Sequence, residues 1–275
     1  GCVVNFGSGN KGTIFESRFL NNDAITSGGG VVNGFTADVT IFDCEFEGNQ
    51  ARFGGAINNQ NDNTRLLLEH NTFSNNSAEL YGGGVNVGAG ITLLVNDCHF
   101  EINTADFGGA IAMDEDSLDL TRLLVVNSTF LQNFCTTQGA ALNLSDTDTE
   151  LTNCLFVTNL NLGEGAGGAI SNNASDGKTS PVKAVNCTFG DNNAPIGGGI
   201  AQWEGAAGTS SLTLQNCIFF NNLPNNYEVE DGDPEVVSLG GNLSGDGSLS
   251  ATLTQTNDLN QMDPMFVDAG NFDYH

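Results

Sequence analysis

The sequence has 275 residues, of which 39% are hydrophobic, which suits one large domain or two ordinary ones with a substantial core. Its 36 glycines follow no Gly-X-Y period, which excludes collagen and indicates many tight turns. With 33 acidic and 7 basic residues, the formal net charge of −26 argues against nucleic acid, anionic membranes and acidic polysaccharides as direct partners. No run of about 18 apolar residues occurs, so we expect no transmembrane helix in this chain.

A short repeat covers most of the chain and is the strongest signal in the sequence. The motif Phe-x-x-Asn occurs eight times, at intervals of 27, 27, 27, 30, 26, 33 and 30 residues. A constant core period with variable additions is typical of one structural unit that carries loops of adjustable length. The motif residues are Phe19/Asn22, Phe46/Asn49, Phe73/Asn76, Phe100/Asn103, Phe130/Asn133, Phe156/Asn159, Phe189/Asn192 and Phe219/Asn222.

Three columns of similar residues lead into each phenylalanine. An apolar residue stands five positions before it, a polar residue three positions before it and a small residue two positions before it. Side chains that alternate with a period of two are typical of strands. Because the alternation slips by one residue at the polar position, we predict two short strands separated by a corner, where Asn and Asp tolerate unusual φ values.

A glycine-rich strand follows each motif in most of the repeats. The segment Gly54-Gly55-Ala56-Ile57 recurs with small variations at 82–85, 108–111, 139–142, 167–170 and 197–200. Three short strands per 27 residues describe one coil of a solenoid. We therefore predict an all-β fold, a right-handed parallel β-helix of about eight to ten coils with three short strands per coil.

The repeat stops near residue 222, which divides the predicted domain into two parts. Residues 1–222 are expected to form the parallel β-helix repeats, and residues 223–275 the terminal coils and a capping tail of the same domain. Within the tail, we expect 239–243 to start one more coil and the acidic stretch 228–235 to form a loop. Both ends are abrupt, so we expect the chain to be a fragment of a longer protein.

The repeat columns also predict how the interior is filled. Five of the seven cysteines occupy the small-residue column, which predicts buried packing, with one disulfide among Cys154, Cys187 and Cys217 as an alternative. The asparagine column predicts a ladder of side-chain amides that hydrogen-bond from coil to coil. The residues before the glycine pairs predict an aromatic stripe along one corner of the rod. This stripe either packs as part of the corner or offers a platform on which sugars stack. Its members include Phe53, Tyr81, Phe107 and Ile196.

Nearly all insertions fall between the glycine-rich strand and the next coil. Stacked coils would align these insertions along one edge of the rod, and loops on one edge of a solenoid are often its binding face. The binding-edge candidates are Trp203, Asp146, Asp148 and Glu150. The insertions themselves are 112–122, 143–148, 171–181 and 201–211.

Carboxylates gather in the first of these insertions. Asp114, Asp116 and Asp119 are candidate metal ligands for Ca²⁺, which is the only cofactor that the sequence suggests. Two other interpretations stay open, namely solvated acidic loops and a carboxylate pair for glycoside hydrolysis. Arg122 stands beside this cluster and is the candidate basic residue for a polysaccharide lyase. The sequence contains no Ser-His-Asp set or Cys-x-x-Cys motif, so we assign no catalytic residue.

The pairing of Phe-x-x-Asn with Gly-Gly-Ala-[Ile/Leu/Val] resembles the repeat of the chlamydial polymorphic outer-membrane proteins over roughly residues 12–222. This resemblance implies a β-helical passenger on a cell surface that is used in adhesion. The segment 263–269 and the final Asp273-Tyr274-His275 resemble the tail of secreted bacterial right-handed β-helix proteins with C-terminal anchoring or sorting regions. Export and anchoring would then depend on regions outside this chain.

Three hypotheses of function follow. The first is a non-enzymatic, extracellular or cell-surface domain, an adhesin or structural passenger whose partner is a glycan or a host or cell-surface protein. The second is a carbohydrate-active enzyme, a lyase or glycoside hydrolase, on the same scaffold. The third, an ice or mineral binder, requires a flat threonine array, and the outward positions beside the phenylalanines are too mixed for one.

Overall fold

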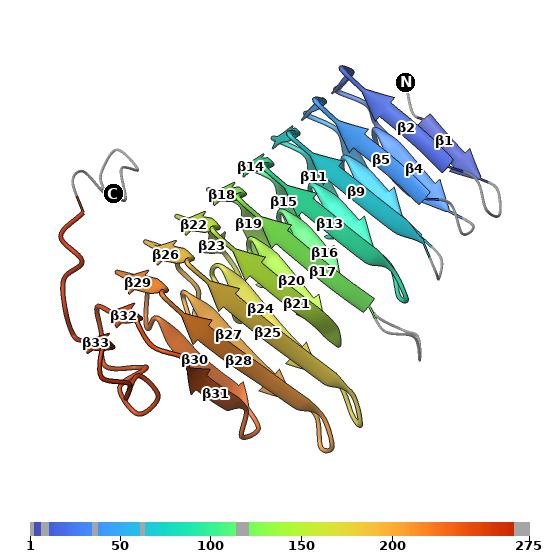
Figure 1. The fold of residues 1–275 in the computed structure, drawn as a ribbon. Coiled ribbons are helices and arrows are strands. Elements are labelled where there is room, and N and C mark those ends of the chain that lie inside the picture. Colours follow the sequence, from blue (N-terminus) through green and yellow to red (C-terminus); the bar gives the residue numbers. More distant parts are fainter. Residues whose placement is uncertain (1–2, 7–10, 35–37, 61–63, 114–120, 267–275) are drawn as a thin grey trace.

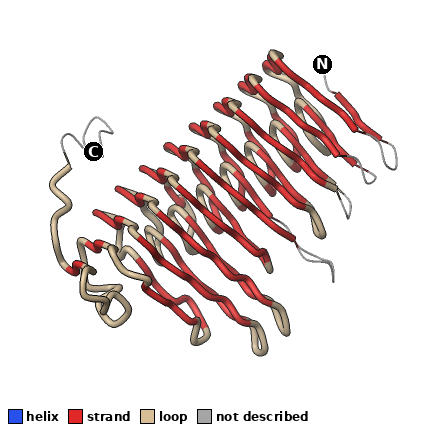
Figure 2. Tube along the Cα trace, viewed as in Figure 1, coloured by secondary structure: helices blue, strands red, loops and turns tan. Residues whose placement is uncertain are grey.

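The computed structural model describes residues 3–6, 11–34, 38–60, 64–113 and 121–266. Within these ranges every regular element is a β-strand, and the strands stack in parallel into a right-handed β-solenoid (Figures 1 and 2). The prediction of an all-β parallel β-helix is therefore confirmed.

Three sheets run the length of the rod and correspond to the three predicted strands of each coil. Sheet B contains β2 (Lys11–Phe15), β5 (Asp38–Phe42), β9 (Arg65–Glu69), β13 (Thr92–Asn96), β17 (Thr121–Val126), β21 (Thr147–Thr152), β25 (Thr179–Val185), β28 (Thr209–Gln215) and β31 (Glu235–Ser238). Sheet C contains β3 (Arg18–Leu20), β6 (Glu45–Glu47), β10 (Thr72–Ser74), β14 (His99–Glu101), β18 (Thr129–Leu131), β22 (Leu155–Val157), β26 (Thr188–Gly190), β29 (Ile218–Phe220), β32 (Leu243–Ser244) and β33 (Leu259–Asn260). Sheet A contains β1 (Val3–Phe6), β4 (Val31–Gly34), β8 (Ile57–Asn59), β12 (Val85–Val87), β16 (Ile111–Met113), β20 (Leu142–Ser145), β24 (Ile170–Ala174), β27 (Ile200–Glu204) and β30 (Tyr227–Asp231).

A fourth sheet, which the sequence did not lead us to expect, lies between sheets C and A in the middle coils. Sheet D contains β7 (Gln50–Phe53), β11 (Ser77–Tyr81), β15 (Thr104–Phe107), β19 (Phe134–Gln138) and β23 (Leu160–Asn161). Its inward side chains are small and buried, because the chain turns tightly here and leaves little room. They are Ala51, Ala78, Ala105 and Cys135, each five positions after a phenylalanine.

Sharp corners separate these strands, and residues with positive φ form them. The polar column is one corner, as predicted, with φ between 45° and 54° at Glu16, Asp43, His70, Asp97, Asn127, Asn153, Asn186 and Asn216. A second corner lies two residues after each phenylalanine and imposes positive φ even on Ile102 and Thr158. The third is the first glycine of each glycine-rich strand. At Gly108, φ is 63° and an added Cβ would lie 2.3 Å from the carbonyl oxygen of Ile111.

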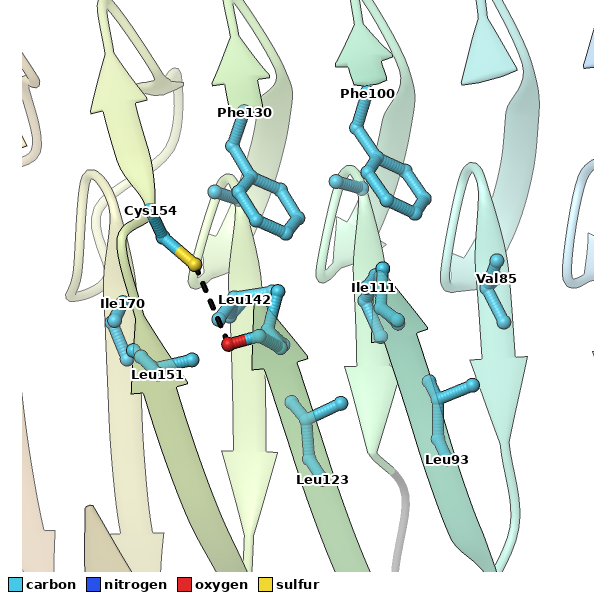
Figure 3. Packing of buried hydrophobic residues seen from close by; sticks show 14 of the residues in the cluster. Val85, Leu93, Phe100, Ile111, Leu123, Phe130, Leu142, Leu151, Cys154 and Ile170 are labelled. Atoms are coloured by element: carbon cyan, nitrogen blue, oxygen red, sulfur yellow. Dashed lines mark hydrogen bonds between the residues drawn. The ribbon is translucent and has the colours of Figure 1, made fainter. Parts of the chain in front are cut away.

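The repeated phenylalanines form a continuous stack inside the rod. Successive rings of sheet C, from Phe19 to Phe219, lie 4.6–5.0 Å apart with interplanar angles of 4–5°. Figure 3 shows Phe100 and Phe130 pointing into the core beside Ile111 of sheet A. The constant coil register places equal side chains above one another, so the core repeats at every coil.

The asparagine column forms the predicted ladder in the buried interior. Asn103 illustrates it: its Nδ2 donates to Asn133 Oδ1 at 3.0 Å and to the carbonyl oxygen of Phe73 at 2.9 Å. Its Oδ1 accepts from the backbone N and the Nδ2 of Asn76, at 3.1 and 3.0 Å. The same pattern recurs from Asn22 to Asn222, so each amide satisfies backbone groups at a corner where no strand ladder can.

Six cysteines lie in the described residues, and all six are buried free thiols. Cys154, Cys187 and Cys217 lie on consecutive coils as free thiols rather than in a disulfide, and each thiol donates to the backbone carbonyl oxygen two residues before it. Burial raises the pKa of Cys98 to about 12, so this thiol stays protonated at neutral pH. The small-residue column is therefore used for packing, as predicted.

Residues after 222 continue the rod for one more coil. The strands β30, β31 and β32 pair in parallel with β27, β28 and β29, and β32 includes Leu243 from the predicted extra coil. The prediction of a loop over 228–235 was wrong for its first half, because Glu228–Asp231 lie in β30 and extend sheet A. Residues 245–266 then pass over the end of the rod on the side of sheet C, where Phe266 packs edge-on against Phe220 (Figure 1).

Candidate binding edge and the outer face of sheet B

The predicted binding edge is the set of turns that join sheet A to sheet B. The strands beside these turns lengthen along the rod: β8 and β9 have three and five residues, whereas β27 and β28 have five and seven. The insertions of the later coils are therefore partly added strand, which carries the edge outward at β25 and β28 (Figure 1).

Asp146 turns the corner between β20 and β21 with φ of 50°. Its side chain is almost fully buried: one carboxylate oxygen accepts from the backbone N of Ser175 at 2.6 Å, and the other lies 3.7 Å from Lys178 Nζ. These contacts connect the turn to the next coil. Asp146 therefore shapes the edge and does not offer a free carboxylate to a ligand.

Trp203 lies near the end of β27, in register with Asn173 of the preceding coil. Its neighbour Gln202 points inward, where it bonds to Ser210 and accepts a hydrogen bond from the hydroxyl of Tyr227 at 2.9 Å. Because side chains alternate along a strand, Trp203 faces outward from sheet A, and it is partly exposed. It is the largest partly exposed side chain on this part of the edge.

Asp148 and Glu150 lie on β21 and project from the outer face of sheet B. Arg122 on the neighbouring β17 contacts both: its guanidinium lies 2.6 Å from Glu150 Oε1 and 3.5 Å from Asp148 Oδ2. This cluster is an ion-pair network on a sheet surface, in which each carboxylate already has a cationic partner. The structure thus brings Arg122, Asp148 and Glu150 together and places Trp203 on a different sheet.

The candidate calcium ligands Asp114, Asp116 and Asp119 lie outside the described residues. Within the described ranges, no three His, Cys, Asp or Glu side chains are arranged to hold a metal ion. A calcium site therefore remains a proposal that depends on those three residues. The described ranges also include no helix with the length and apolar character needed to cross a membrane.

The aromatic stripe before the glycine pairs packs as a corner stack. The rings of Phe53 and Tyr81 lie 6.0 Å apart and those of Tyr81 and Phe107 lie 5.0 Å apart, with each pair stacked. The guanidinium of Arg52 lies 5.2 Å from the centroid of Phe53. Since the ring faces cover one another along the rod, they do not form the flat platform that stacks on sugars.

The outer face of sheet B has a feature that sequence reasoning missed. Four of the seven basic residues of the chain project from this single face, on alternate strands of the sheet. Only the strand register reveals this, because their spacing in the sequence is irregular. They are Lys11 on β2, Arg65 on β9, Arg122 on β17 and Lys183 on β25.

Fold and site together define a parallel β-solenoid repeat protein in which every described repeat column has a structural role. Comparison with known families finds the Chlamydia polymorphic membrane protein repeat at residues 43–60. This segment runs from the corner at Asp43 through β6, β7 and β8, which is most of one coil. The match indicates an outer-membrane or surface protein. No curated protein and no solved structure matches the chain.

Proposed function

We propose that this chain is a non-enzymatic, rod-shaped passenger domain of an extracellular or cell-surface protein, and that it acts in adhesion. The observation that carries the proposal is the use of the repeated polar side chains. The asparagines bond to one another and to backbone carbonyls, so they are structural and do not bind a ligand. What varies from coil to coil is the edge between sheets A and B, where an adhesive protein would bind its partner.

The polymorphic membrane protein repeat supports a surface location, and the solenoid supports an extended presenting scaffold. The partner is a glycan or a protein of another cell surface, and Trp203 is the anchoring side chain of the edge, because aromatic residues dominate such contacts. Calcium bound by Asp114, Asp116 and Asp119 would neutralise the acidic edge and allow an anionic partner to approach.

Binding arrays of glycans and extracellular-matrix proteins, probed with and without Ca²⁺, test this proposal. We expect selective binding by the chain, and a loss of about tenfold or more in affinity for Trp203→Ala. The matched control is Ile25→Ala, which removes an apolar side chain that is 93% exposed away from the edge and should leave binding unchanged. Release of oligosaccharides from polysaccharides by the chain, or equal effects of the two variants, would contradict the proposal.

A further inference from the structure

The outer face of sheet B differs in charge from the rest of the molecule. Its outward side chains include the four basic residues named above and five acidic residues, so the face has a net charge of −1. The remaining 3 basic and 28 acidic residues give the rest of the chain −25. The five acidic residues are Asp38, Glu69, Asp148, Glu150 and Glu235.

The charges on this face are also ordered along the rod. One column of aligned side chains begins with Lys11, Asp38 and Arg65, and its later members include Arg122, Asp148 and Glu235. Across the whole face, the strands from β2 to β13 carry two basic and two acidic side chains, and the strands from β17 to β31 carry two basic and three acidic ones. Reversing one copy pairs β9 with β21 and β5 with β25, which brings the basic Arg65 to the acidic Asp148 and the acidic Asp38 toward the basic Lys183.

Leucines occupy the middle of the same face. Leu67, Leu94 and Leu124 are aligned on β9, β13 and β17 and point outward, where they are only partly covered. Their inward neighbours, such as Leu93 and Leu123, fill the core, so the outward leucines are not needed for it. An apolar centre surrounded by charged residues is the usual arrangement of a protein–protein interface.

We propose that two copies of this chain associate through the outer faces of sheet B, with their rods antiparallel. The two-fold axis would run along the strands between β13 and β17. This places Leu94 of one copy against Leu124 of the other, and Arg65 against Asp148, each twice. Asp38 then lies one side chain away from Lys183 of the other copy.

The size of the face suits such a pair. The axis pairs the eight strands from β2 to β28, which at about 4.8 Å apart and five residues of about 3.3 Å each give a face of roughly 38 by 17 Å, or about 650 Å². Specific interfaces bury about 800 Å² on each partner. An acidic polymer on this face would be repelled by its five carboxylates and by the net charge of −25 on the rest of the chain. A second copy, which brings both basic and acidic side chains, is therefore a better electrostatic match than an acidic polymer. At physiological ionic strength the Debye length of about 8 Å screens the acidic flanks of the two copies from each other.

Light scattering coupled to size exclusion, with small-angle X-ray scattering, tests the proposal on the 275-residue chain over about 1 µM to 1 mM. We expect twice the monomer mass of 28.7 kDa at the upper end. The scattering should show two rods side by side. End-to-end stacking, which would roughly double the longest dimension, or a monomer at every concentration, would overturn the proposal.

Charge reversals identify the face. We expect Arg65→Glu and Asp148→Arg each to weaken dimerisation at least tenfold, and the double variant to recover most of it, because the exchanged charges again face each other. The control Arg52→Glu makes the same change on sheet D and should leave the dimer intact, and circular dichroism checks that each variant is folded. Dimerisation that survives both single reversals, or a double variant weaker than either, would exclude this face.

Discussion

Asn103→Ala tests the asparagine ladder at its centre. Asn103 is fully buried on the fourth coil, and its amide makes four hydrogen bonds of 2.9–3.1 Å to residues of neighbouring coils. Alanine removes all four without adding bulk. If the ladder holds the corners of successive coils together, this single change should weaken the whole stack.

The expected loss follows from what each partner keeps. Asn76 Nδ2 still donates to the carbonyl oxygen of Phe46, and Asn133 Oδ1 still accepts from the backbone N of Asn103. The backbone N–H of Asn76, however, has no other acceptor among the described residues. Three of the lost bonds count for about 1 kcal/mol each and the orphaned buried donor for about 1–3 kcal/mol, so we expect a loss of about 4–6 kcal/mol in the free energy of unfolding.

Urea denaturation followed by circular dichroism measures this loss. The matched control is Asn96→Ala on the same coil, whose outward amide makes one 3.4 Å contact with Glu69, and it should cost less than about 0.5 kcal/mol. Equal effects of Asn103→Ala and Asn96→Ala would refute the reasoning, because they would show that the buried amides add nothing beyond a surface contact.

Three further predictions concern the stack, the corners and the buried thiols. Phe100→Ala should lower the free energy of unfolding, measured by urea denaturation, by about 3–5 kcal/mol. Phe15→Ala removes a ring that is 54% exposed and should lower it far less. Similar losses for the two variants would contradict a stabilising role for the inner stack. Gly108→Ala should lower the melting temperature more than Gly177→Ala. Both glycines have positive φ, but an added Cβ meets the carbonyl oxygen of Ile111 at Gly108 and nothing within 4 Å at Gly177. Equal changes in melting temperature would mean that the clash with the Ile111 carbonyl costs no stability. Because burial raises the pKa of Cys98 to about 12 from an ordinary 9.0, its contribution to stability is complete below pH 9 and is lost as pH rises toward 12, by up to about 1.4 kcal/mol per pH unit. The free energy of unfolding should therefore differ less between pH 8 and pH 10 in Cys98→Ser than in the parent chain. An unchanged difference would show that ionisation of this thiol does not cause the loss of stability at high pH.

Sequence reasoning predicted the parts of the fold in which one residue type is required. Only an aromatic ring fills the stacked core at Phe46 and its equivalents, and only a side chain that both donates and accepts can continue the ladder at Asn49. The corner before each phenylalanine was predicted because Asn and Asp tolerate its φ. The second corner was not, because the fold imposes the same φ on Ile102 and Thr158, whose types give no such signal.

Sheet D was missed because small residues form its inward column. Ala51, Ala78 and Ala105 recur five positions after each phenylalanine, and this regularity was the available signal. Alanine has no strand preference, so the column alone does not predict a strand. The charge pattern of sheet B could not be predicted for another reason. The strand register is needed to show that one face carries Lys11, Arg65, Arg122 and Lys183.

Distances along the rod test the central claim, that successive coils lie in register on one another. Pulsed electron paramagnetic resonance measures these distances between two nitroxide labels at outward positions of sheet C. The labels are attached to genetically encoded ketone residues, so that the labelling reaction leaves the native thiols unmodified. With one label at Thr72, the second moves from Thr188 to Ile218 to Leu243, which lie four, five and six strands away. Stacked coils predict distances of about 19, 24 and 29 Å, since neighbouring strands lie about 4.8 Å apart. Distances that do not rise by one strand spacing per coil would contradict the account.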